Sequence, residues 1–338
     1  MRARELGLAC GSLPPGTHNS IADVPGVMVG HATLIDGDAC TGVTAVLPHD
    51  GDLFRDKPVA AAVVLNGFGK SVGLVQVNEL GTLETPILLT NTFAVGVCAT
   101  ALIRRAIGAD PEIGRQTSTV NPVVLECNDG YLNDIQAMAV TEAHAEAAID
   151  AAAEEFDVGA VGAGTGMSCF GLKGGIGSAS RRLRVAGETY HLGALVLANF
   201  GRAGDLRLPD GRRVDPGSAP SAEAGSCIVV LGTDLPLDHR QLGRVARRAG
   251  VGLAWCGSFW GNGSGDIALA FTTANRMPHT ADQDLIEHRV LAEARIDRLF
   301  QAAAEATQEA VLDALAAAET TIGRQGHRRV GLADVLGR

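Results

Sequence analysis

Short apolar runs that end in turn residues recur along much of this chain of 338 residues. Many of the runs are rich in Val, Ile and Leu and stop at Gly or Pro, which is typical of β-strands. On this pattern we predict strands at 41–48, 59–69, 191–201 and 227–231, a strand that runs into a turn at 122–130, and a Gly-rich turn that leads into a strand at 261–276.

A second pattern, apolar residues three and four positions apart, predicts helices between these strands. The predicted helices are 91–108, 138–156 and 238–254, with one or two long amphipathic helices in 281–323. Helices and strands are mixed throughout and no fixed repeat is present, so the expected class is α/β or α+β. We expect the glycines of the run 158–182 to let one backbone pass close to another or to line a site. The polar segment 201–225 is predicted to be an exposed, flexible linker.

Composition narrows the function classes. A net charge of −10, with only two Trp and two Tyr, speaks against a nucleic-acid partner. The seven cysteines are scattered without CxxC spacing, which favours reduced, buried thiols. We find no signal-like apolar segment at the start and no apolar run of membrane-spanning length, so we expect a cytoplasmic protein without a membrane partner.

The common catalytic and binding motifs are absent. In the Gly-rich run, Leu172 precedes Lys173 and Gly174 follows it, which breaks the phosphate-loop motif, and Cys169 occupies the third glycine position of the dinucleotide motif. No histidines have HExxH or HxH spacing, so we expect no metal. The GxSxG motif of serine hydrolases is also absent.

One serine could nevertheless act as a nucleophile without a histidine as its base. Ser226 lies between Gly225 and the apolar run that begins at Cys227, at what we expect to be the exposed entrance to a buried strand. Cleavage of the bond before Ser226 would give this residue a free α-amine, whose reference pKa near 8 suits a base at neutral pH. Gly225 would tolerate the strained backbone that such a cut requires. From composition alone, an ordinary Gly-Ser turn remains the alternative.

Seven sequence blocks, in order along nearly the whole chain, resemble the P1 family of N-terminal-nucleophile peptidases. This family includes L-aminopeptidase/D-esterase and the β-peptidyl aminopeptidases. The blocks are NSIADVPGVMVGHATL, LGTLETPILLTNTFAVGV, ECNDGYLNDI, GAGTGMSCFGLKGGIGSASR, LVLANFG, GSCIVVLGTDLPLDHRQLGRVARRAGVGL and NGSGDIALAFTTANR.

The resemblance implies self-cleavage at Gly225-Ser226, which would yield an α chain of residues 1–225 and a β chain of residues 226–338. It also implies a set of site residues: Ser226 as nucleophile, Ser264 and Asp266 beside it, Asn199 in the oxyanion hole and Glu126 holding the substrate's amine. Several relatives carry a tyrosine where this chain has Asn128, and Tyr131 is the candidate to replace it. An ordinary turn or strand-end role remains the alternative for Asn199, Ser264, Asp266 and Glu126.

The family further implies a four-layer αββα sandwich, assembly as tetramers of αβ units, and catalysis without a metal or organic cofactor. We therefore expect an aminopeptidase or amidase acting on small peptides, amides or esters. Two enzymatic alternatives are a hydrolase of ω-amino-acid oligomers or other non-peptide amides, and an acyl transferase similar to ornithine acetyltransferase. The nucleophile of that transferase is a threonine, so Ser226 speaks against it.

Overall fold

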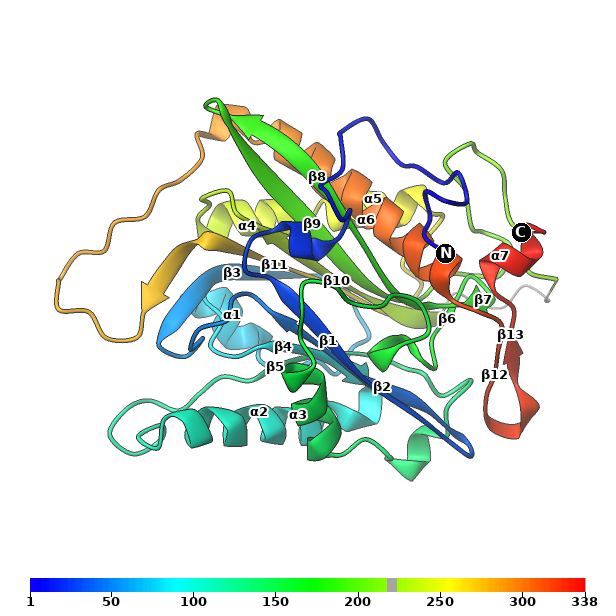
Figure 1. Ribbon diagram of the computed structural model, residues 1–338, viewed down its shortest axis with the longest axis horizontal. Coiled ribbons are helices and arrows are strands. Elements are labelled where there is room, and N and C mark those ends of the chain that lie inside the picture. Colours follow the sequence, from blue (N-terminus) through cyan, green and yellow to red (C-terminus); the bar gives the residue numbers. More distant parts are fainter. Residues whose placement is uncertain (218–223, 338) are drawn as a thin grey trace.

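Two β-sheets form the centre of the molecule in the computed structural model, which describes residues 1–217 and 224–337 (Figure 1). One sheet has four strands in the order β1 (Met28–Asp36), β2 (Ala39–Leu47), β4 (Ile87–Asn91) and β5 (Val123–Cys127). The other has five, in the order β3 (Asp56–Gly67), β11 (Gly263–Pro278), β10 (Ala224–Thr233), β9 (Glu188–Asn199) and β8 (Gly175–Val185). Two short hairpins, at one end of the molecule, are β6 (Ser168–Cys169) with β7 (Leu172–Lys173) and β12 (Thr321–Ile322) with β13 (Arg328–Arg329).

Strand alternation explains how these sheets stack. On β10, Ile228 and Val230 pack between the two sheets, whereas Cys227, Val229 and Leu231 pack against the helices outside the five-stranded sheet. A third core, which includes Leu88 of β4 and Cys98 of the helix that packs on this sheet, lies outside the four-stranded sheet. The result is four layers, helix–sheet–sheet–helix, as Figure 1 shows. The predicted αββα sandwich is confirmed.

The helices occupy the two outer layers. Those on the four-stranded sheet are α2 (Val95–Ala109) and α3 (Glu142–Asp150), and those on the five-stranded sheet are α4 (His239–Ala246), α5 (Ala249–Trp255) and α6 (Asp297–Ala317). The short helices α1 (Leu74–Leu80) and α7 (Leu332–Val335) complete the described helices of more than three residues.

Three of the predicted helices are shorter or broken in the structure. The helix predicted at 138–156 is only α3, because Ala153 leaves the helix to exchange backbone hydrogen bonds with Val29 of β1. The segment 238–254 forms two helices rather than one. In the C-terminal segment, α6 is the long helix, and residues 281–292 are not helical. There, Asn275 Nδ2 donates to the Arg289 carbonyl at 2.7 Å, and the Leu291 amide donates to the Pro236 carbonyl, so tertiary contacts replace the helix.

The polar segment 201–225 is not simply an exposed linker. Within its described part, Leu206, Leu208 and Val214 are buried in the core of the five-stranded sheet's helix layer. Residues 218–223 lie outside the described residues. The prediction for the Gly-rich run is confirmed at Gly177, where an added Cβ would lie 2.0 Å from the Ala310 carbonyl of α6. The prediction of buried thiols also holds, since all seven cysteines are free and buried.

One apolar segment differs from the sequence-based expectation about membrane spans. Residues Thr92–Ala109 have the length and mean hydropathy, 1.4, that a membrane-spanning helix requires. In this fold, however, Cys98, Ala101 and Leu102 pack against the four-stranded sheet, and Arg105 forms ion pairs with Glu146 and Asp150. The segment is therefore a layer of the sandwich.

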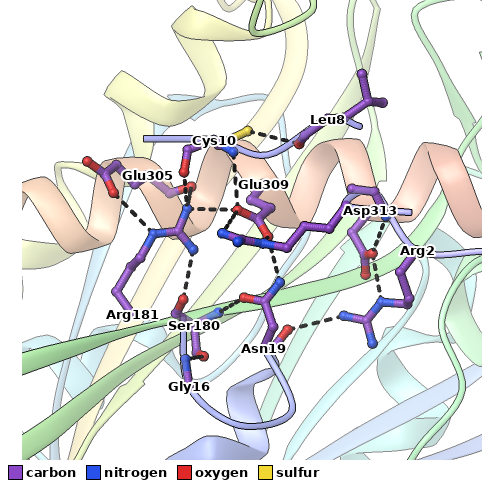
Figure 2. Close-up of polar contacts among 12 residues, drawn as sticks. Arg2, Leu8, Cys10, Gly16, Asn19, Ser180, Arg181, Glu305, Glu309 and Asp313 are labelled. Carbon is purple, nitrogen blue, oxygen red and sulfur yellow. Dashed lines mark hydrogen bonds and ion pairs between the residues drawn. The ribbon is translucent and has the colours of Figure 1, made fainter. Parts of the chain in front are cut away.

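A buried group of charges fixes the N-terminal segment to α6, as Figure 2 shows. Arg181 of β8 is fully buried and forms ion pairs with Glu305 at 3.1 Å and Glu309 at 2.9 Å. Its guanidinium also donates to the Cys10 carbonyl at 2.7 Å. Arg4 binds Glu309 through two hydrogen bonds, of 2.5 and 2.9 Å. Because buried charges require such partners, this network ties three distant parts of the sequence together.

Candidate active site

A cavity of about 640 Å³ opens where β10 begins, and most of the sequence-predicted site residues line it. The lining includes Glu126, Asn128, Tyr131, Asn199, Gly225 and Ser226. Ser264 and Asp266 are not among the lining residues and lie fully buried on β11. The residues come from β5, β9, β10 and the loop after β5, so the fold collects them from distant parts of the chain.

Ser226 lies inside the strand rather than at its exposed entrance. It is only 3% exposed, and β10 already begins at Ala224. Alternation along β10 puts the Ser226 side chain on the same face as Ile228 and Val230, which is the face between the two sheets. Its Oγ donates a hydrogen bond of 2.7 Å to the Gly225 carbonyl, so the hydroxyl lies against the peptide group that precedes it.

The surroundings of residue 225 leave room only for a glycine. Its φ of +127° lies in a region that residues with a side chain rarely adopt. An added Cβ would lie 2.0 Å from the carbonyl oxygen of Asn199, well inside van der Waals contact. The residue before the serine is therefore held in a strained conformation by the neighbouring strand.

Asn199 is the last residue of β9 and pairs with Ser226 in the sheet register. Its Oδ1 accepts from the Ser168 amide at 2.8 Å, and its Nδ2 donates to the Asn128 carbonyl at 2.9 Å. These two bonds fix the orientation of the side-chain amide. The second N–H of Nδ2 has no hydrogen-bond partner among the described residues and belongs to a side chain that lines the cavity.

Glu126 is a buried acid and not an exposed strand-end residue, since it is 2% exposed. Its Oε1 accepts from the backbone amide of Lys70 at 2.8 Å, and its Oε2 accepts from the Thr92 hydroxyl. Neither partner is a cation. A carboxylate that is buried at a cavity wall with only neutral donors is suited to bind the ammonium group of a ligand.

Ser264 and Asp266 flank Ser226 on the neighbouring strand. The parallel register pairs Gly225 with Ser264, Ser226 with Gly265 and Cys227 with Asp266. Because side chains alternate, Ser264 and Asp266 share one face, which is opposite the Ser226 hydroxyl. The Ser264 hydroxyl is fully buried and has no hydrogen-bond partner among the described residues. Both residues therefore lie beside the backbone around Ser226 rather than beside its Oγ.

At the position where several relatives carry a tyrosine, this chain has Asn128, which lies in the turn after β5. Asn128 is exposed, and its Oδ1 accepts from the Gly130 amide at 2.9 Å. Tyr131 does line the cavity, with its ring stacked on His327 at 4.7 Å between centroids and the Arg329 guanidinium 3.6 Å from its ring centroid.

Several cavity residues were missed by sequence reasoning. Thr92 and Ser168 hold Glu126 and Asn199 in place, and both lie in or next to quoted family blocks, which was the only signal for them. Lys70 and Phe68 follow β3, with the Lys70 Nζ 3.8 Å from the Phe68 ring centroid. Arg329 comes from the C-terminal hairpin, which no pattern in the sequence predicts.

Known proteins resemble this chain over almost its full length. The crystal structure of the PH0078 protein from Pyrococcus horikoshii OT3 has 48% sequence identity and a TM-score of 0.93, covering 98% of this chain and 96% of that chain. The L-aminopeptidase D-Ala-esterase/amidase of Ochrobactrum anthropi is described as a prototype serine aminopeptidase with a variant Ntn hydrolase fold. It has 36% identity and a TM-score of 0.90, with 99% and 96% covered. The β-peptidyl aminopeptidase BapA of Sphingosinicella microcystinivorans is 37% identical in an alignment of length 354, which covers 96% of this chain and 88% of the relative.

The sandwich, with a buried serine, a side-chain amide and a buried carboxylate around one cavity, defines a serine aminopeptidase of the N-terminal nucleophile hydrolase class. Residues 19–329 match Peptidase family S58. The chain belongs to this family, and the resemblance found in its sequence blocks is confirmed.

Proposed function

We propose that this aminopeptidase cuts itself between Gly225 and Ser226, and that the freed α-amine of Ser226 then serves as its catalytic base. The observation that carries the proposal is the 2.7 Å contact of Ser226 Oγ with the Gly225 carbonyl at the cavity. Attack of Oγ on that carbonyl carbon gives an ester, with the proton passing to the departing nitrogen. Hydrolysis of the ester leaves residues 1–225 as one chain and 226–338 as the other.

The Ser264 hydroxyl, which has no hydrogen-bond partner in the described part of the chain, supports this sequence of events. It lies on β11 beside Gly225, next to the backbone nitrogen that cleavage would turn into an amine. In the cut protein this hydroxyl and the Asp266 carboxylate would orient the amine. Buried hydroxyls normally have a hydrogen-bond partner, and the amine would supply one for Ser264.

In the proposed reaction the substrate's ammonium binds the Glu126 carboxylate, and its first carbonyl group lies at Ser226. Ser226 Oγ attacks, its own amine takes the proton, and the second N–H of Asn199 stabilises the oxyanion. One such donor contributes roughly 3 kcal/mol to a transition state of this type. The amine then protonates the leaving nitrogen, and water releases the acyl group.

For the substrate we propose an N-terminal residue of small peptides, amides or esters, with β-amino acids included because a curated relative is a β-peptidyl aminopeptidase. Intact mass measurement tests the cleavage, with fragments of about 23 and 12 kDa expected. A panel of α- and β-aminoacyl anilides and short peptides tests the activity. An intact chain with full peptidase activity would reject the proposed mechanism.

The remaining expectations, a cytoplasmic protein that assembles as a tetramer of αβ units, stay part of this proposal. Sedimentation of the purified protein measures the assembly, and a monomeric αβ unit with full activity would contradict the proposed tetramer.

Substitution of Gly225 by alanine is expected to slow self-cleavage at least ten-fold. A Cβ cannot occupy the space at the Asn199 carbonyl, so the backbone must move and carry the Gly225 carbonyl away from Ser226 Oγ. The rate is read from the loss of the full-length band over time. Gly217→Ala is the matched control, since Gly217 also has a positive φ, of +70°, but an added Cβ there would have no atom of the described residues within 4 Å. Equal cleavage in both variants would contradict the role of Gly225.

Substitution of Glu126 by glutamine is expected to lower kcat/KM for aminoacyl substrates on the order of 100-fold while leaving the cleavage of the chain intact. The amide keeps the size of the side chain and loses the charge that binds the ammonium group. Steady-state kinetics with an aminoacyl anilide give the effect. The fold is monitored by the thermal midpoint, and an unchanged kcat/KM in a stable variant would assign the amine site elsewhere.

A further inference from the structure

The cavity holds a cation for which the proposed reaction has no use. Arg329 of β13 lines the cavity, and its side chain is held by a hydrogen bond of 3.1 Å from Nε to the Ser168 hydroxyl. Its guanidinium lies 3.6 Å from the Tyr131 ring centroid. No carboxylate of the described residues forms an ion pair with it, whereas Arg2, Arg4 and Arg181 all have one.

This cation is oriented by its surroundings. Nε is occupied by Ser168, so the two terminal nitrogens, with four N–H groups, remain to bind a ligand. The hairpin that carries Arg329 is itself anchored, because Arg324 Nε donates to the Gly130 carbonyl at 2.9 Å and the Lys173 amide donates to the Val330 carbonyl. The guanidinium is therefore positioned before any ligand binds.

Glu126 lies near the β11 neighbour of Ser226, whereas Arg329 is linked to its β9 neighbour. On one side of β10, Ser226 pairs with Gly265 of β11, and an added Cβ on Gly69 would lie within 4 Å of both Gly265 Cα and Glu126 Oε1. On the other side, Ser226 pairs with Asn199 of β9. Asn199 Oδ1 accepts from the Ser168 amide, and the Ser168 hydroxyl accepts from Arg329. A substrate whose ammonium lies on Glu126 and whose carbonyl lies on Ser226 thus extends toward Arg329.

We propose that Arg329 binds the C-terminal carboxylate of the leaving amino acid, so that the preferred substrates are dipeptides with a free C-terminus. This inference rests on the proposed function. Each residue of an extended peptide adds about 3.5 Å, so the carboxylate of a one-residue leaving group stays near the nucleophile. A planar guanidinium with two free nitrogens matches a carboxylate with two parallel hydrogen bonds.

The test compares a dipeptide with a β-alanyl residue first and L-alanine second with the same dipeptide carrying a C-terminal amide. The wild-type protein is expected to have a kcat/KM at least ten-fold higher for the free acid, chiefly through a lower KM, because the C-terminal carboxylate takes no part in the breaking of the peptide bond. In Arg329→Gln this preference is expected to fall to about one, because the free acid loses the partner of its carboxylate.

Two variants sharpen the comparison. Arg328→Gln removes the exposed neighbouring arginine of the same strand and is expected to keep the wild-type preference. Arg329→Lys keeps the charge but not the planar pair of donors, so an intermediate preference is expected. Wild type without a preference for the acid, or an equal preference in Arg329→Gln, would overturn the proposal. If the wild-type protein hydrolyses neither substrate, this result would instead reject the proposed function.

Discussion

Replacement of Ser226 by alanine is expected to leave a single uncut chain of 34.8 kDa and to lower hydrolysis on the order of 10⁴-fold or more. The substitution removes the Oγ that contacts the Gly225 carbonyl, and without the cut no α-amine is formed at this position. Denaturing electrophoresis and intact mass give the first result, and turnover of an aminoacyl anilide gives the second.

The conservative variant Ser226→Thr separates the loss of the hydroxyl from disturbance of the strand. Threonine keeps an attacking oxygen and suits a β-strand, so part of the cleavage and of the turnover should remain. An alanine variant that is still cut after residue 225, or that hydrolyses substrate at the wild-type rate, would refute the role of Ser226.

Arg181→Gln is expected to lower the free energy of unfolding by about 3–5 kcal/mol, the cost of leaving buried acids without their partner. Glu305 and Glu309 would lose ion pairs of 3.1 and 2.9 Å inside the protein. Denaturant unfolding in the Ser226→Ala background measures the effect, since the uncut chain unfolds as one molecule. Arg182→Gln on the same strand is the control, because Arg182 is exposed. Similar losses in the two variants would show that the buried ion pairs are not the cause.

The same network sets a dependence on pH. Burial raises the pKa of Glu309, but the hydrogen bond from Arg4 and the charge of Arg181 outweigh burial and hold this pKa below its usual value of 4.5. A group with a depressed pKa in the folded state stabilises the protein above its unfolded pKa and loses this effect as the pH falls. We therefore expect stability to decline below about pH 4.5, and to decline less in Arg181→Gln, where part of the stabilisation is already lost.

The sequence pointed to residues that the fold brings to one cavity, but not to how they are enclosed there. Ser226, Asn199 and Glu126 lie in family blocks, and their residue types suit the proposed roles. Their burial was not predictable, because Ser226 and Glu126 are enclosed by strands and loops from other parts of the chain. The place of Arg329 in the cavity was not predictable for the same reason, since only the fold brings the C-terminal hairpin to Ser168.

The fold class was predictable from the mixture of periodicities, whereas element ends were not. Helical spacing continues past Asp150, but the pairing of Ala153 with Val29 ends the helix there. In residues 281–292, the Pro236 and Asn275 contacts compete with helix formation in the same way. Local pattern carries no information about such distant partners.

The order of strands in the five-stranded sheet has a consequence for the protein's lifetime. The cut at Gly225 would assign β10 and β11 to the smaller product, and β3, β9 and β8 to the larger one, with β11 and β10 inserted between β3 and β9. Neither product contains a contiguous version of this sheet. The five-stranded sheet must therefore form before the cut. If the two chains of the cut protein later separate, the sheet can form again only after they meet by diffusion. The mature enzyme would thus owe its persistence to a slow rate of opening rather than to ready refolding.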